Sequence, residues 1–303
     1  MTLSTLTSKA LAPKTWKNTT SLTAGMDPEA QYHEIYRVLA TYEFPWDIMQ
    51  SLSFALFRTY AVPSVGELLD ETREFRDRAQ KRYDDTAILL EIPMINGFDS
   101  RDGKSAIRRI NQMHKMYDIP NEDMLYVLAT FVVVPVRWIA DYGWRQLTAD
   151  EIRAMTLYYR ALGRHMAIKN VPETYDEFAT LMDSYEAEHY VSGGTPGVRR
   201  TGDATMDLFA SFYLKPVRPL INPFSRAVMD DPLLDAFGYR APHRLFRAAS
   251  IAGLKLRGKA VAYLPKRRRP QLIQDMARVK SYPDGFQIDA LGTFAKSGCP
   301  VKH

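Results

Sequence analysis

Apolar positions recur at steps of three and four residues along most of the chain from Pro28 onward. The strict alternation of apolar and polar residues that marks a half-buried strand is scarce. Helix starts are visible as capping boxes at Thr148–Glu151 and Thr174–Glu177, and Gly143 follows a long apolar stretch as a helix stop. We therefore predict an all-α protein, with a single large helical domain of roughly a dozen helices.

The predicted helical domain spans residues 27–292, between a flexible N-terminal tail (1–26) and a C-terminal tail (293–303). Ser64–Glu67 has the form of a third capping box, and Asn121 is a candidate cap for the next long apolar helix. The apolar stretch Met124–Ala140 contains Pro135 and an arginine, which favours a buried core helix over a membrane span. The loop at 191–202 is the clearest break, but it is too short to separate independent domains.

The helix predicted from Ser64 to Ile92 places Arg82 and Thr86 on its apolar stripe, one turn apart. An inward arginine needs an explanation, because a guanidinium cannot lose its proton and must find an anion or water. One alternative is a structural ion pair with a buried carboxylate. The other is an anionic group of a bound molecule, such as a cofactor carboxylate. The full stripe comprises Leu68, Thr72, Phe75, Ala79, Arg82, Thr86 and Leu90.

The next predicted helix, residues 104–117, carries His114 on the face that also holds Ile107 and Ile110. An inward histidine is either a hydrogen-bonded core residue or a metal ligand. As a ligand, a single imidazole in an apolar wall suits haem iron, whereas zinc would need further ligands close by.

Other catalytic patterns have little support. Glu186–His189 holds one Glu-x-x-His motif, whereas a di-iron carboxylate bundle needs two, so a di-iron helical oxidase is kept only as an alternative. The motifs of zinc proteases, α/β-hydrolases, P-loop proteins and dinucleotide-binding folds are absent.

The charge distribution adds expectations about partners and location. The net charge is +5, and the run Lys266–Arg269 is either a solvated connector or a site of peripheral contact with anionic membrane lipids. Nucleic-acid binding is not expected, because no known nucleic-acid-binding motif accompanies the run. Cys299 is the only cysteine, which excludes an internal disulfide and a cysteine zinc site. Because no signal-peptide pattern opens the chain, we expect a cytoplasmic protein.

Four segments, in this order, resemble one family of haem oxygenases. The family is typified by the latex clearing protein (rubber oxygenase) and by the endoplasmic-reticulum-bound (ER-bound) oxygenase of mycophenolic acid biosynthesis, and the chain is more similar to the second. The segments are Lys81–Thr86, Ile107–His114, Leu162–Tyr175 with its Val-Pro-Glu-Thr-Tyr end, and Tyr282–Gly292 with its Tyr-Pro-Asp-Gly-Phe start.

The resemblance implies that His114 is the axial iron ligand of a b-type haem, and that Arg82 and Thr86 lie beside the haem on the facing helix. Arg82 would contact the cofactor, and both residues would act in catalysis. The implied reaction uses O₂ to cleave or oxidise the C=C bond of a hydrophobic, isoprenoid-like alkene, in the manner of a dioxygenase. A haem- or lipid-binding helical protein without turnover is the alternative.

The chain departs from the family at three places. The latex clearing branch has a lysine just before the threonine, where this chain has Asp85, so that lysine cannot cap the iron here. Its catalytic glutamate has no secure counterpart, although Gly66 and Glu67 lie near the equivalent spacing. The membrane anchor of the mycophenolate-type oxygenase is not found at the start of this sequence.

Overall fold

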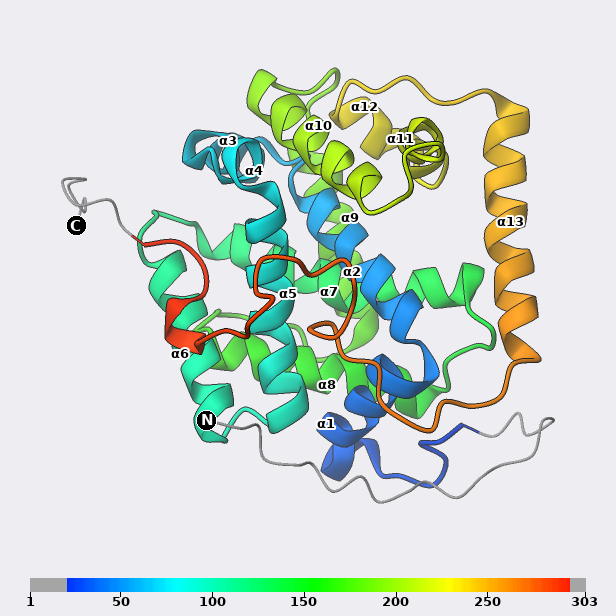
Figure 1. The fold of residues 1–303 in the computed structure, drawn as a ribbon. Coiled ribbons are helices and arrows are strands. Elements are labelled where there is room, and N and C mark those ends of the chain that lie inside the picture. Colours follow the sequence, from blue (N-terminus) through cyan, green and yellow to red (C-terminus); the bar gives the residue numbers. More distant parts are fainter. Residues whose placement is uncertain (1–20, 295–303) are drawn as a thin grey trace.

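The computed structural model describes residues 21–294, which form thirteen α-helices, the π-helix η1 and the 3₁₀-helix η2, with no strand among them (Figure 1). The predicted all-α fold with roughly a dozen helices is confirmed. In chain order the elements are α1 (Pro28–Val38), η1 (Leu39–Glu43), α2 (Pro45–Thr59), α3 (Pro63–Thr72), α4 (Glu74–Asp77), α5 (Ala79–Asn96), α6 (Arg101–His114), α7 (Asn121–Tyr142), α8 (Ala149–His165), α9 (Tyr175–His189), α10 (Pro196–Ser211), α11 (Arg218–Ala227), α12 (Asp231–Ala236), α13 (Arg244–Ala262) and η2 (Ile288–Ala290).

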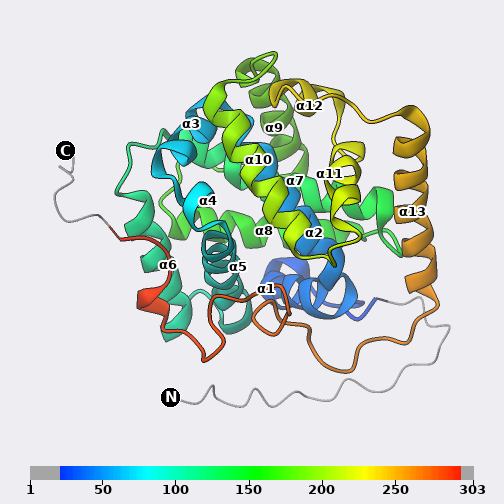
Figure 2. The same ribbon diagram turned by 45° about the horizontal axis from the view of Figure 1, so that its top comes forward.

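Helix α7 lies in the middle of the main core and packs against α2, α8 and α9 (Figure 2). Among the described residues, α7 alone has the length and apolar composition to cross a membrane, yet 67% of its apolar stretch is buried in the protein. It is the core helix that Pro135 and Arg137 predict. A second, smaller core lies between α3, α10 and α12, where Phe57 stacks on Phe237 with ring centroids 4.5 Å apart.

The predicted capping boxes at Thr148 and Thr174 are present. The one predicted at Ser64 is wrong, because Pro63 already starts α3 and the Ser64 hydroxyl donates to Asp123 at 3.0 Å. Asn121 is also not a side-chain cap, since its carbonyl oxygen accepts from the Lys169 amide at 2.8 Å.

The single helix predicted from Ser64 to Ile92 is three helices, so that prediction is wrong. Its first part ends at Thr72, whose hydroxyl accepts from the Glu74 amide at 3.4 Å and so competes with helical hydrogen bonding. Arg73 then takes the left-handed conformation, with φ of 59°, and the short α4 ends at Asp77. The direction of helix α5 is therefore not tied to the direction of α3. Helix α5 runs past the predicted end at Ile92 to Asn96, and Gly97 follows it.

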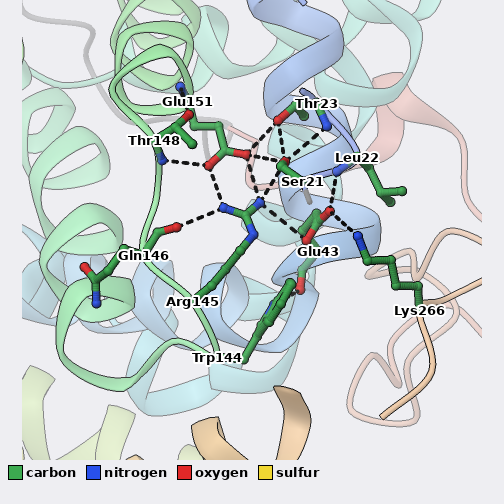
Figure 3. A network of polar contacts seen from close by, with 10 residues as sticks. All are labelled: Ser21, Leu22, Thr23, Glu43, Trp144, Arg145, Gln146, Thr148, Glu151 and Lys266. Carbon is green, nitrogen blue, oxygen red and sulfur yellow. Dashed lines mark hydrogen bonds and ion pairs between the residues drawn. The ribbon is translucent and has the colours of Figure 1, made fainter. Parts of the chain in front are cut away.

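The segment at 21–23, part of the predicted N-terminal tail, is held by a buried polar network (Figure 3). The hydroxyls of Ser21 and Thr23 both donate to Glu151 Oε1 at 2.6 Å. Arg145 pairs with the same carboxylate at 2.7 Å and lies 3.4 Å from the carboxylate of Glu43. The network joins the start of the described chain to η1 and α8. Residues 1–20 of the predicted tail, residues 295–303 and Cys299 lie outside the described part.

The last described segment, residues 271–293, crosses α5 and reaches α6 in both ribbon views (Figures 1 and 2). Among the side chains of these helices that hold its backbone, three are charged and buried. Glu91 accepts from the Ile273 amide at 2.5 Å, Asp84 accepts from the Ser281 amide at 3.0 Å, and Arg109 donates to the Leu291 carbonyl at 2.7 Å. A segment without regular structure is thus fixed by charged groups that are themselves buried.

Replacing Glu151 by Gln should lower the free energy of unfolding by about 3 kcal/mol at pH 7, measured by urea denaturation. Burial raises the pKa of Glu151, but hydrogen bonds from Arg145, Ser21 and Thr23 outweigh it and lower the pKa from 4.5 to about 2. This stabilisation is complete above pH 4.5 and is lost as the pH falls towards 2, so stability should fall less steeply with acid in the variant. Glu188→Gln, at an exposed site on α9, is the control. Equal stability of both variants at pH 7 would contradict the assignment.

Candidate functional site

A cavity of about 480 Å³ lies between α3, α5, α6 and α7, with walls that are mostly apolar. Its size is typical of pockets that enclose a small molecule or cofactor. The apolar lining comes mainly from the inward faces of these helices and from the loop after α6. It includes Leu56, Val65, Leu68, Leu69, Leu89, Leu90, Ile110, Met113, Ile119, Met124, Val127, Leu128, Phe131, Leu162, Met166 and Ile168.

His114 lines this cavity as the last residue of α6. The helix starts earlier than predicted, at Arg101, because the Ser100 side chain caps it, and it ends at the histidine. The Nδ1 atom of His114 is buried and has no hydrogen-bond partner among residues 21–294. Burial, helped by the positive charge of Arg82, lowers the pKa of His114 from 6.5 to about 4. The imidazole is therefore neutral at pH 7, which is the form that can bind a metal.

Arg82 and Thr86 line the same cavity from α5. The Arg82 guanidinium donates to the Thr86 hydroxyl, which in turn donates to the Arg82 carbonyl at 2.9 Å. The guanidinium also lies 5.7 Å from the ring centre of Phe75. Within the described chain Arg82 forms no ion pair, and it is the only arginine or lysine in the cavity wall. The expected structural ion pair with a buried carboxylate is thus not what these residues form.

The structure therefore brings His114, Arg82 and Thr86 to one cavity, as the resemblance implies, although the predicted continuous helix is broken. Leu68 and Thr72 from the first part of that stripe lie in the wall as well, contributed by α3. The break at Arg73 separates α3 from α5 without removing either from the cavity.

Several wall residues were not predicted. Glu67 and Asp123 are at the cavity, and both are bound to other parts of the protein: Glu67 accepts from the Gly197 amide at 3.0 Å, and Asp123 accepts from Ser64. The sequence places Glu67 near the spacing of the family's catalytic glutamate without a secure role, and the false capping box assigns its carboxylate to its own helix. Gly292 and Thr293 also line the cavity, from a segment that has no periodic pattern to reveal it.

Asp85, which stands where the latex clearing branch has a lysine, is buried and faces away from the cavity lining. It accepts from Lys81 Nζ at 2.6 Å and from the Tyr282 hydroxyl. Its role here is to hold the last segment of the chain against α5.

The residues of the di-iron alternative are engaged elsewhere. Glu186 is paired with Arg58 at 2.5 Å and accepts from the Tyr126 hydroxyl at 3.0 Å. His189 stacks on Tyr185 with ring centroids 3.9 Å apart. Within residues 21–294, no group of three or more His, Cys, Asp or Glu side chains could hold a metal ion, so this arrangement gives the di-iron alternative no support.

Residues 46–255 match the family described as ER-bound oxygenase mpaB/B′ and rubber oxygenase, catalytic domain. The chain is 29% identical over 271 residues to the ER-bound oxygenase mpaB′ of Penicillium brevicompactum, which covers 83% of this chain and 64% of that protein. It is 32% identical over 201 residues to the ER-bound oxygenase mpaB of the same species, covering 60% of this chain and 51% of the relative. It is 30% identical over 247 residues to mpaB of Penicillium roqueforti (strain FM164), covering 76% and 83%.

The chain thus spans between about half and two thirds of the length of the two Penicillium brevicompactum proteins. The names of these relatives also correct the predicted location of the protein. All three relatives are ER-bound oxygenases, which points to association with the endoplasmic reticulum and contradicts the predicted cytoplasmic location. The expectation failed because it rested on a signal pattern missing from the start of the sequence, and such a pattern is not the only means of reaching a membrane.

Replacing Arg82 by Met should raise the pKa of His114, because the variant removes a positive charge that disfavours the imidazolium. Burial is the larger cause of the low value, so the pKa should stay below 6.5. An NMR titration of histidine-labelled protein measures this directly. Arg108→Met, on the exposed face of α6, is the matched control and should leave the pKa unchanged. An unchanged pKa in Arg82→Met would show that the guanidinium does not act on the ring.

Proposed function

Because the chain belongs to the family of ER-bound mpaB-type oxygenases and rubber oxygenases, we propose that it is a haem b-dependent oxygenase acting on a hydrophobic alkene. The observation that carries the proposal is the His114 imidazole in the wall of an apolar cavity, neutral and with a ring nitrogen that has no partner in the described part of the chain. O₂ would be the co-substrate. Oxidation or cleavage of an isoprenoid-like C=C bond, as a dioxygenase would perform it, is the proposed reaction.

The residues present fit a b-type haem in three respects. His114 offers a nitrogen ligand that needs no deprotonation at pH 7. The apolar walls suit a macrocycle, and the cavity volume of about 480 Å³ is adequate for a cofactor-sized ligand. Arg82 is a cation without an ion pair in the described chain, so it could pair with a haem carboxylate. When bound, the haem would supply the activation of O₂.

The chain's own residues would have three tasks in the reaction. Arg82 would neutralise an anionic group and, through its hydrogen bond, fix the direction of the Thr86 hydroxyl. Thr86 would turn its hydroxyl proton, which it donates to the Arg82 carbonyl in this structure, towards the polar end of the reactants. The leucine, methionine and phenylalanine side chains of the wall would orient the alkene and exclude water.

The haem-binding step is tested by adding hemin to the purified chain and recording the absorbance spectrum. A Soret band should appear, and His114→Ala should lose most of the bound haem. His165→Ala is the control, because His165 faces a groove on the outer side of α6 rather than the cavity. A protein that stays colourless, or an alanine variant at 114 with full haem content, would end the proposal. Two irons per chain without porphyrin would instead favour the di-iron alternative.

The catalytic step is tested with Arg82→Met and Thr86→Val in the haem-loaded enzyme. Each should lower the turnover of terpenoid alkenes by about 100-fold, since each removes a hydrogen-bond donor from the cavity. Haem content should stay close to that of the unaltered protein in Thr86→Val. Arg78→Met, an exposed arginine paired with Glu74, is the control. Undiminished turnover in both cavity variants would make these residues structural. The absence of any product from the unaltered protein would favour the haem- or lipid-binding protein without turnover.

A further inference from the structure

Helix α13 lies along one edge of the molecule, where it contacts α11 and the end of α7 (Figures 1 and 2). Its inward face is marked by three buried residues one turn apart, Ser250, Leu254 and Gly258. On the opposite face, Leu245 is 75% exposed and Leu256 is 68% exposed. The outward stripe advances by steps of three and four residues and comprises Leu245, Ala249, Ala252, Leu256, Ala260 and, just after the helix, Tyr263.

The orientation of this stripe is fixed by contacts on the inner side of the helix. Gly258 allows α13 to approach the end of α7, because a Cβ atom there would lie 2.4 Å from the Tyr142 carbonyl oxygen. Arg257 pairs with Asp47 at 2.6 Å and lies 3.9 Å from the ring centre of Trp46. The protein therefore holds α13 with Leu245 and Leu256 towards solvent.

The charge around the stripe has one sign. Residues 236–274 contain ten arginine and lysine residues and no aspartate or glutamate. Arg244, Lys255 and Lys259 are exposed along one flank of the stripe, and none of them has an ion pair within the described chain. The exposed part of the basic run, residues 267–269, follows the helix directly. Lys266 itself is turned inward, 3.9 Å from Glu43.

We propose that the outward face of α13 binds the surface of an anionic lipid bilayer, with the helix parallel to the membrane plane. Exposed leucine and tyrosine side chains would enter the interface between head groups and acyl chains, while the flanking lysines would reach the lipid phosphates. The helix has 19 residues and is about 28 Å long, enough for several head groups along its length. This inference goes beyond the proposed oxygenase activity and requires neither haem nor substrate.

The charge also argues against two other partners for the outward face of α13, a second copy of the chain and a nucleic acid. A second copy of the chain would bring two rows of positive charge together without any acidic residue between them. A nucleic acid would match the charge but would leave the leucine stripe in water. An anionic bilayer satisfies both features at once.

Flotation of the full chain with lipid vesicles tests the proposal. The protein should float with vesicles of phosphatidylcholine mixed with phosphatidylserine, and much less with phosphatidylcholine alone. Replacing Lys255 and Lys259 together by Gln should weaken binding to the anionic vesicles by about 30-fold, from roughly 1 kcal/mol per charge. Replacing Leu256 and Tyr263 together by Ser should weaken it at least ~10-fold.

The matched controls lie on other surfaces. Lys104→Gln with Arg108→Gln removes two exposed charges from α6, and Val191→Ser removes a valine that is 45% exposed in the loop before α10. Neither should change vesicle binding, and circular dichroism should show unchanged melting for all variants because every site is exposed. No binding of the unaltered protein to anionic vesicles, or full binding by both α13 variants, would overturn the proposal. So would a dimer in light scattering that the Leu256 and Tyr263 variant converts to a monomer, since the face would then bind a second copy.

Discussion

Helix α5 carries polar side chains on two opposite faces. One set lines the cavity and the other binds the last described segment, and the position of the cavity depends on this separation. On one face, Arg82 and Thr86 point into the cavity together with Leu89. On the other, Asp84 and Glu91 bind backbone amides of the last described segment. Helical spacing alone separates the two sets, because residues three and four apart share a face. A one-residue shift in α5 would put carboxylates into the apolar cavity and leave the amides of the last segment without acceptors, which is costly for buried groups.

The ionisable side chains around the cavity form an uncommon combination. A neutral histidine and an arginine without an ion pair face one space, while the nearby carboxylates of Glu67 and Asp123 are occupied by other donors. Arg82 is half-buried and has no carboxylate partner within residues 21–294, so it loses part of its hydration without gaining an ion pair. A bound anion beside His114 would remove that cost, so the binding of a cofactor and the stability of the fold would be thermodynamically linked.

Local periodicity predicts the helical class, the core role of α7 and the inward direction of Arg82, Thr86 and His114, whereas their meeting at one site is implied only by the resemblance to the family. Prediction from the sequence fails where a side chain can bind either its own helix or a residue far away in the chain. Ser64 and Glu67 fit a capping box, yet in the fold they bind Asp123 and the start of α10. The break after Thr72 depends on a hydroxyl that competes with the helical backbone. The contribution of Gly292 and Thr293 could not be predicted, since the segment has no periodicity and its position is set by Asp84, Glu91 and Arg109.

The last described segment closes one side of the cavity but lies outside the region that matches the family. The family match ends at residue 255, inside α13, whereas Gly292 and Thr293 complete the cavity wall. A polypeptide cut at the end of the matched region would retain every helix that bears His114, Arg82 and Thr86, but its pocket would have an open side. In a member of the family that differs after α13, the same three side chains would face a cavity with a different wall.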